Sequence, residues 1–162
     1  MQAEILNPFF QEFMKRIMNI IPEDRKAVPG DFIIKKEMYT GYDISLLVEM
    51  SGDANGRIVM SMEPRVSLEL SETMMGSPVD SFEKQAQSAI SELLNIIIGN
   101  ALTQLSDKNY DIRFSPVSLF FNKRIRTNTK EVPIAVTQHI SCEWGGIELN
   151  LALMLNSVNP TN

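Results

Sequence analysis

The sequence is organised around residues 81–107, SFEKQAQSAISELLNIIIGNALTQLSD. In this stretch apolar side chains recur every three to four residues, which is the spacing of one face of an α-helix. The face predicted to be buried comprises Ala86, Ile90, Leu93, Leu94, Ile97 and Ala101. The opposite face carries a narrow polar strip of Gln85, Ser88, Glu92, Asn95, Gly99 and Thr103. The stretch therefore predicts a long helix with one side in the core and one side on which a partner can dock.

Glu92 and Asn95 form an E-x-x-N pattern on neighbouring turns of the polar strip. The pattern alone is weak evidence, because 13 Glu and 12 Asn in 162 residues give about one chance occurrence. Gly99 lies one turn further on, where it costs about 1 kcal/mol of helix propensity relative to Ala but leaves the helix surface flat. We interpret this combination as an open site.

A second E-x-x-N pattern occurs at Glu4 and Asn7 and is followed directly by Pro8. Asn-Pro before an apolar run is typical of an N-cap followed by the first helical residue. We therefore expect a first helix over residues 8–20, with Glu4 outside it and this copy of the pattern without a role.

The segment ISELLNIIIGNALTQL (residues 90–105) resembles the helix of the CheX, CheC and FliY chemotaxis phosphatases that carries E-x-x-N, and CheX most closely. SETMMGSPVD (residues 71–80) and EILNPFFQEF (residues 4–13) extend the resemblance to about half of the chain. One departure is Leu94, where relatives often have Gly. The helical angles direct Leu94 to the core, so we interpret it as a packing residue. CheC and FliY typically carry two such helices, whereas CheX carries one.

The resemblance implies a CheC-like α+β fold with pseudo-symmetric halves and a phosphatase acting on the aspartyl phosphate of a response-regulator receiver domain. It implies that Glu92 pairs with the receiver's Lys and that Asn95 orients the attacking water. Ser88, Ile96 and Gly99 flank the pair and are expected to contact the partner. No cofactor or metal of its own is expected, because the Mg²⁺ belongs to the receiver, and a homodimer is implied.

Two other functions stay open. The chain could be a non-catalytic module that keeps the helix for binding a receiver or a flagellar-switch component. It could also be a structural protein whose polar strip is simply solvated.

Composition narrows the classes of function. A chain of 162 residues with 44% hydrophobic residues is long enough for one substantial core, so one domain over residues 1–162 is expected. The formal charge of −5 disfavours nucleic acid and anionic membrane as partners. One Cys excludes an internal disulfide, and one Cys with one His cannot supply an ordinary zinc site. Without a targeting or membrane-spanning segment, a cytoplasmic location is expected.

The remaining periodicities predict an α+β protein with an antiparallel sheet of about six strands. Strands are expected over residues 32–39, 44–51, 58–63, 109–122, 134–142 and 147–153, with a turn over 52–56 containing Asn55-Gly56 and a short helix over 64–75. Pro116 lacks a backbone N–H, which predicts an interrupted edge strand. The apolar residues around it, SPVSLFF (residues 115–121), give weak support for pairing between two copies. His139, Cys142, Trp144 and the ten Met residues are interpreted as structural.

Overall fold

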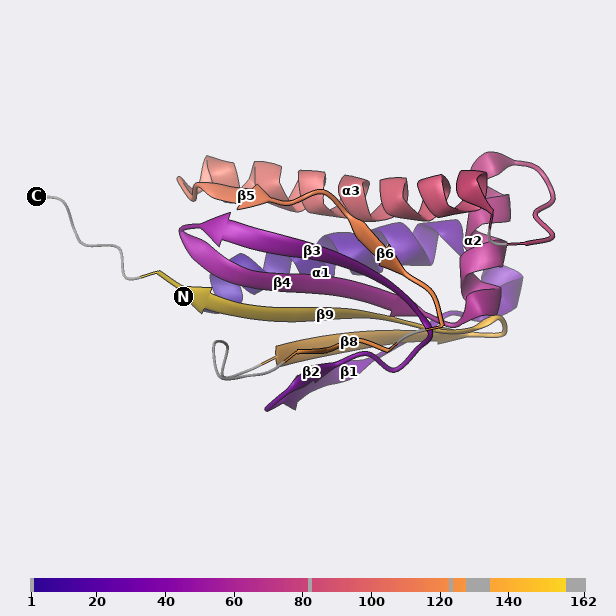
Figure 1. The fold of residues 1–162 in the computed structure, drawn as a ribbon, viewed down its shortest axis with the longest axis horizontal. Helices are drawn as coiled ribbons and strands as arrows, with labels where there is room; N and C mark the ends of the chain where they lie inside the picture. The colour runs from indigo at the N-terminus through magenta and orange to yellow at the C-terminus, as the bar shows by residue number, and fades with distance from the viewer. Residues whose placement is uncertain (1, 82, 123, 128–134, 157–162) are drawn as a thin grey trace, which may run out of the picture.

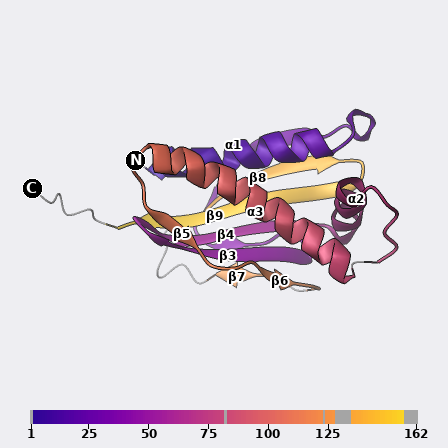
Figure 2. The same cartoon turned by 90° about the horizontal axis from the view of Figure 1, so that it is seen from above.

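The described residues of the computed structural model, 2–81, 83–122, 124–127 and 135–156, form a twisted sheet with helices along one face (Figures 1 and 2). The helices are α1 (Gln2–Ile20), η1 (Glu23–Arg25, a 3₁₀ turn), α2 (Pro64–Met75) and α3 (Lys84–Asp107). The strands are β1 (Val28–Lys35), β2 (Met38–Tyr39), β3 (Ile44–Gly52), β4 (Ala54–Met62), β5 (Ile112–Phe114), β6 (Ser118–Phe120), β7 (Arg126–Thr127), β8 (Ala135–Cys142) and β9 (Gly145–Leu155).

The main sheet has seven antiparallel strands in the order β1-β8-β9-β4-β3-β5, with β6 also paired to β3. The hairpins β3–β4 and β8–β9 meet through β4 and β9 in the middle of the sheet. Each hairpin receives its outer strand from the other half of the chain, since β1 pairs with β8 and β5 pairs with β3. The predicted α+β class, antiparallel sheet and pseudo-symmetric halves are confirmed. The strand count exceeds six because the interruption at Pro116 separates β5 from β6.

The core lies between the sheet and the two long helices. Phe9, Phe13 and Ile17 of α1 are fully buried, as are Ile90 and Leu93 of α3, and both rows pack on the inward side chains of the central strands. α1 and α3 lie side by side over the sheet while α2 stands at one end of it (Figure 2). Because one face of each strand is covered by helices, the apolar alternation along β3, β4 and β9 points toward them.

The prediction that the first helix begins at Pro8 is wrong. α1 begins at Gln2 and continues through Pro8, so Glu4 and Asn7 both lie within the helix and both are exposed. An interior Pro costs about 3 kcal/mol because its residue has no N–H and its ring crowds the preceding turn. Ile5 and Pro8 are both buried in the core, and this burial offsets that cost. Tertiary packing therefore overrides the local preference for a helix that begins at Pro8.

The turn predicted over residues 52–56 is right at its start but wrong at Asn55-Gly56, because both of these residues lie in β4 opposite β9. The chain reverses at Gly52 and Asp53 instead, where Gly52 has a φ of 107°. A Cβ on Gly56 would collide with the backbone oxygen of Ala152, so this glycine permits close approach of two strands. The strand expected over residues 32–39 divides into β1 and the separate β2, which pairs with β7. Residue 134, where the strand expected over residues 134–142 was to begin, lies outside the described residues.

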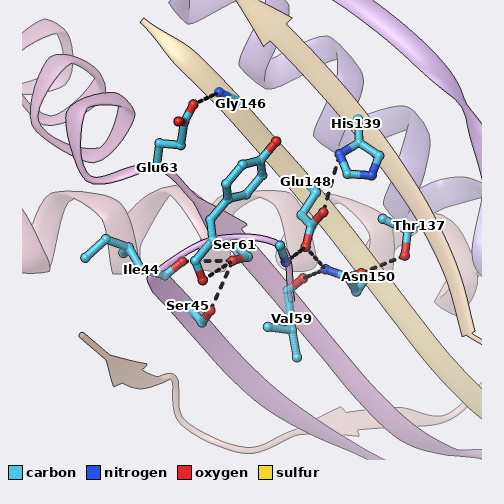
Figure 3. A network of polar contacts seen from close by, with 12 residues as sticks. Ile44, Ser45, Val59, Ser61, Glu63, Thr137, His139, Gly146, Glu148 and Asn150 are labelled. Carbon is cyan, nitrogen blue, oxygen red and sulfur yellow. Dashed lines mark hydrogen bonds and ion pairs between the residues drawn. The ribbon is translucent and has the colours of Figure 1, made fainter. Parts of the chain in front are cut away.

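A polar network occupies the sheet face opposite the helices (Figure 3). Its centre is Glu148, whose side chain is 1% exposed. Oε1 of Glu148 accepts hydrogen bonds from the backbone N–H of Gly41 at 2.7 Å and from Nδ2 of Asn150 at 3.1 Å. Oε2 accepts no hydrogen bond within the described chain but lies 3.3 Å from Nδ1 of His139. The network thereby fastens the connection between β2 and β3 to the sheet.

One further hydrogen bond and one phenol belong to this network. Oγ1 of Thr137 donates a hydrogen bond to Oδ1 of Asn150 at 2.6 Å. Burial, together with the carboxylates of Glu148 and Glu63, raises the pKa of the Tyr42 phenol, which therefore stays protonated at neutral pH. The structural interpretation of His139 is consistent with its place in this network.

Removing the central carboxylate is expected to destabilise the fold. Glu148→Ala leaves the Gly41 N–H and one N–H of the Asn150 amide without an acceptor, and each buried donor left unsatisfied typically costs about 1–3 kcal/mol. The matched control is Glu49→Ala, because the Glu49–Arg57 pair is exposed and such pairs contribute about 0–1 kcal/mol. Urea unfolding of both variants measures the difference. A Glu148→Ala protein as stable as Glu49→Ala would contradict the assigned role.

Candidate functional site

The polar strip lies on the outer surface of α3, as predicted. Ser88, Glu92, Asn95 and Gly99 are exposed and Ile96 is half-buried. The side chains predicted to be buried, Ile90, Leu93, Leu94 and Ile97, are at most 1% exposed. The structure thus brings the predicted site residues together on one surface and assigns Leu94 to the core.

Glu92 and Asn95 present unpaired polar groups. Within the part of the chain that the structure describes, neither side chain takes part in a hydrogen bond or an ion pair. The two residues lie three positions apart in α3, so their side chains leave adjacent turns of one helix face. One carboxylate and one amide are therefore available together for a partner.

The other E-x-x-N copy differs in this respect. The hydroxyl of Tyr110 donates a hydrogen bond to Oε2 of Glu4 at 2.9 Å, and Nζ of Lys108 lies 4.0 Å from Oε1. The carboxylate of Glu4 is thus already engaged within the chain. The expectation that this copy lies outside the helix is wrong, but the contacts of Glu4 distinguish it from Glu92 on other grounds.

Gly99 leaves an opening beside Asn95. A Cβ built at this position meets no atom within 4 Å, so the absence of a side chain is not required by packing inside the chain. The hydroxyl of Thr103 is turned inward along the helix, donating to the carbonyl of Gly99 at 3.1 Å. The surface next to Asn95 is consequently flat backbone that another molecule can approach closely.

A buried carboxylate from α1 holds α3 in its orientation. Glu12, only 7% exposed, accepts hydrogen bonds from Nδ2 of Asn100 at 3.3 Å and from Nε2 of Gln104 at 3.0 Å. These contacts lie on the side of α3 that faces α1 and fix its rotation, which keeps the polar strip outward. The sequence analysis missed this role of Glu12, because its partners are 88 and 92 residues away along the chain.

Metal ligation and membrane insertion find no support in the described chain. No group of three or more His, Cys, Asp or Glu residues is placed to hold a metal ion there. His139 lies on the sheet face opposite α3, remote from the polar strip (Figure 3). Among the described helices, none is long and apolar enough to cross a bilayer.

The fold and the polar strip together define a class of protein: an α+β domain in which a packed helix exposes the carboxylate of Glu92 and the amide of Asn95. The family model described as chemotaxis phosphatase CheX matches residues 44–138, more than half of the chain and including α3. The chain belongs to the CheX family.

Solved structures share the fold at low sequence identity. A CheC-like chemotactic protein from Shewanella oneidensis MR-1 aligns with a TM-score of 0.83 and 18% identity over 95% of this chain and 100% of that one. CheX from Vibrio vulnificus aligns with a TM-score of 0.79 and 20% identity over 94% and 100%. The CheX of a Borrelia burgdorferi CheX–CheY–BeF3–Mg²⁺ complex aligns with a TM-score of 0.72 and 20% identity over 91% and 96%. No curated protein matches the chain.

Proposed function

We propose that the chain is a phosphatase acting on the aspartyl phosphate of a response-regulator receiver domain, with Glu92 and Asn95 as its catalytic pair. The observation that carries the proposal is the unpaired carboxylate and amide beside the open backbone of Gly99, in a chain of the CheX family. The Borrelia burgdorferi complex of CheX with CheY supports a receiver domain as the class of partner.

Asn95 is suited to positioning water. Hydrolysis of an acyl phosphate needs a water molecule in line with the bond that breaks, and little covalent chemistry from the protein. A side-chain amide can accept a hydrogen bond from that water and donate another to the phosphoryl group. A hundredfold gain in rate from this orientation requires about 2.7 kcal/mol. The packed helix supplies the rigidity that such positioning needs.

Glu92 is suited to docking. It is the only charged residue of α3 between Lys84 and Asp107, so it offers one negative charge to the receiver's Lys. We assign the Mg²⁺ to the receiver, because one carboxylate on the strip is too few ligands for an ion that prefers several oxygens. Ser88, Ile96 and Gly99 complete the proposed contact surface, where Ile96 supplies apolar area and the two small residues allow close approach.

Asn95→Ala tests the catalytic role. We expect the accelerated loss of phosphate from a cognate phosphorylated receiver to fall by about a hundredfold, while binding to the receiver with BeF3⁻ changes by less than about threefold. The measurement is single-turnover dephosphorylation together with calorimetric titration. Asn19→Ala is the matched control, since Asn19 is an exposed asparagine on α1 and should leave both quantities unchanged.

The same experiment separates the alternatives. If wild type and Asn95→Ala bind receivers but leave every dephosphorylation rate unchanged, the enzymatic role fails and a binding module is favoured. If wild type binds no receiver, the strip is a solvated surface of a structural protein.

Gly99→Trp tests where the receiver docks. We expect it to abolish receiver binding, because the indole would occupy the open surface beside Asn95, while the melting temperature stays equal or rises slightly. Gly99→Ala is the matched control: it gains about 1 kcal/mol of helix propensity, more than Trp gains, and adds one methyl group in open space, so binding should persist. A folded Gly99→Trp protein that binds normally would place the interface elsewhere.

The homodimer implied by the family resemblance is also proposed here. The polar strip lies on one chain, so the catalytic pair does not require a second copy.

A further inference from the structure

Arg16 of α1 has a buried polar atom that the described part of the chain leaves without a partner. Its Nε is buried but donates no hydrogen bond, and the side chain forms no hydrogen bond or ion pair with any other described residue. The residue as a whole is only half-buried, so the terminal nitrogens Nη1 and Nη2 of the guanidinium reach solvent. A buried donor without an acceptor lowers the stability of a folded chain, so the fold gains nothing from the charge of Arg16.

Arg16 lies at the junction between α1 and α3. It follows Glu12 by one turn, so the two side chains leave the same face of α1, and Glu12 contacts Asn100 of α3. The two helices run in opposite directions, so the next turn of α1 lies toward Ile96 on α3 (Figure 2). Figure 2 also shows the helices diverging toward α2, which explains why α3 provides no acceptor for Arg16. Because Ile96 belongs to the proposed contact surface, Arg16 borders that surface.

We propose that Arg16 binds a carboxylate of the receiver domain at the edge of the α3 contact surface and thereby contributes to the choice of receiver. This inference rests on the proposed function, because it takes a receiver domain as the partner, but it does not depend on catalysis by Asn95. Nη1 and Nη2 carry N–H donors in a planar fork, which matches the two oxygens of a carboxylate.

The charge of the proposed contact surface favours an acidic group as the ligand of Arg16. The chain has a formal charge of −5, and Glu92 is the only charged residue of α3 between Lys84 and Asp107. A receiver that holds Mg²⁺ presents carboxylates around it, because this ion prefers oxygen ligands. Two negative surfaces repel one another, so a cation beside α3 favours their encounter. It also disfavours a receiver that lacks an acid at the matching place.

The geometry favours a carboxylate on the surface of the receiver over its phosphoryl group. At about 100° per residue, Ile96 lies only about 40° around α3 from Asn100, which faces α1, whereas Asn95 lies about 140° away. The axes of packed helices are about 8–10 Å apart. Arg16 therefore reaches the near edge of the contact surface and not the reacting phosphate beside Asn95.

Arg16→Met is the test, because methionine keeps an unbranched side chain and removes the guanidinium. We expect the dissociation constant for a cognate receiver with BeF3⁻ to rise at least about tenfold, as is typical for the loss of a hydrogen-bonded charge. The single-turnover rate of dephosphorylation at saturating receiver should change by less than about twofold. The melting temperature should stay equal or rise, since the buried donor without an acceptor is removed.

Lys15→Met is the matched control, because it removes the same charge from the neighbouring residue of α1. Lys15 is exposed and lines a groove with Phe10 and Phe32 on the β1 side of the helix, away from α3. Its affinity for the receiver should stay within about twofold of wild type. Titration of the receiver without BeF3⁻ is the second comparison. Arg16→Met should lose affinity by the same factor there, because a surface carboxylate is present in both forms.

The opposite results overturn the proposal. An Arg16→Met protein that binds as tightly as Lys15→Met rejects the contact, and a lower melting temperature with unchanged affinity assigns Arg16 to packing. A loss confined to the form with BeF3⁻ would assign the contact to the phosphoryl group and reject the carboxylate. If wild type binds receivers without dephosphorylating them, only the enzymatic part of the proposed function fails and the affinities still test Arg16. If wild type binds no receiver, both proposals fail.

Discussion

The packing of the inner face of α3 on the sheet is the constraint on which the arrangement of this protein depends. Leu93, Leu94 and Ile97 are buried against the central strands, and the hydrogen bonds from Asn100 and Gln104 to the buried Glu12 set the rotation of the helix against α1. Because α3 is held both by the sheet and by α1, the backbone of its exposed face is rigid. The exposed polar strip is therefore a consequence of burial on the other sides of α3.

The sequence predicts α3 well because the same apolar pattern recurs in every turn of the helix. Each turn carries at least one apolar residue on the core side, so the burial of Leu94 and the exposure of Asn95 follow from helical angles alone. The hairpins β3–β4 and β8–β9 are similarly determined by alternation. Their ends are less well determined, because Asn55-Gly56 resembles a turn locally while the reversal is fixed by the close approach of Gly52 to Asp111, which is distant in the sequence.

Polar networks were not predictable in the same way. Glu148 meets Gly41 across 107 residues, and Glu12 meets Asn100 across 88. A charged residue in an alternating strand is expected to face solvent, so its burial becomes visible only when the segment that covers it is placed. The two-residue strands β2 and β7 carry no periodicity, and the start of α1 depended on burial of Pro8 that no local rule indicates.

The two E-x-x-N copies show what separates a motif from a site. Both lie on exposed faces of long helices, so helical spacing and exposure do not distinguish them. Their surroundings do: Glu4 is engaged by Tyr110 and Lys108, and the position one turn beyond Asn7 carries the side chain of Gln11, where α3 has Gly99. A carboxylate that is already paired must give up that pairing before it can dock, which weakens any binding by the same amount. Unpaired polar groups beside open backbone are therefore the stronger criterion, and within these two copies only α3 meets it.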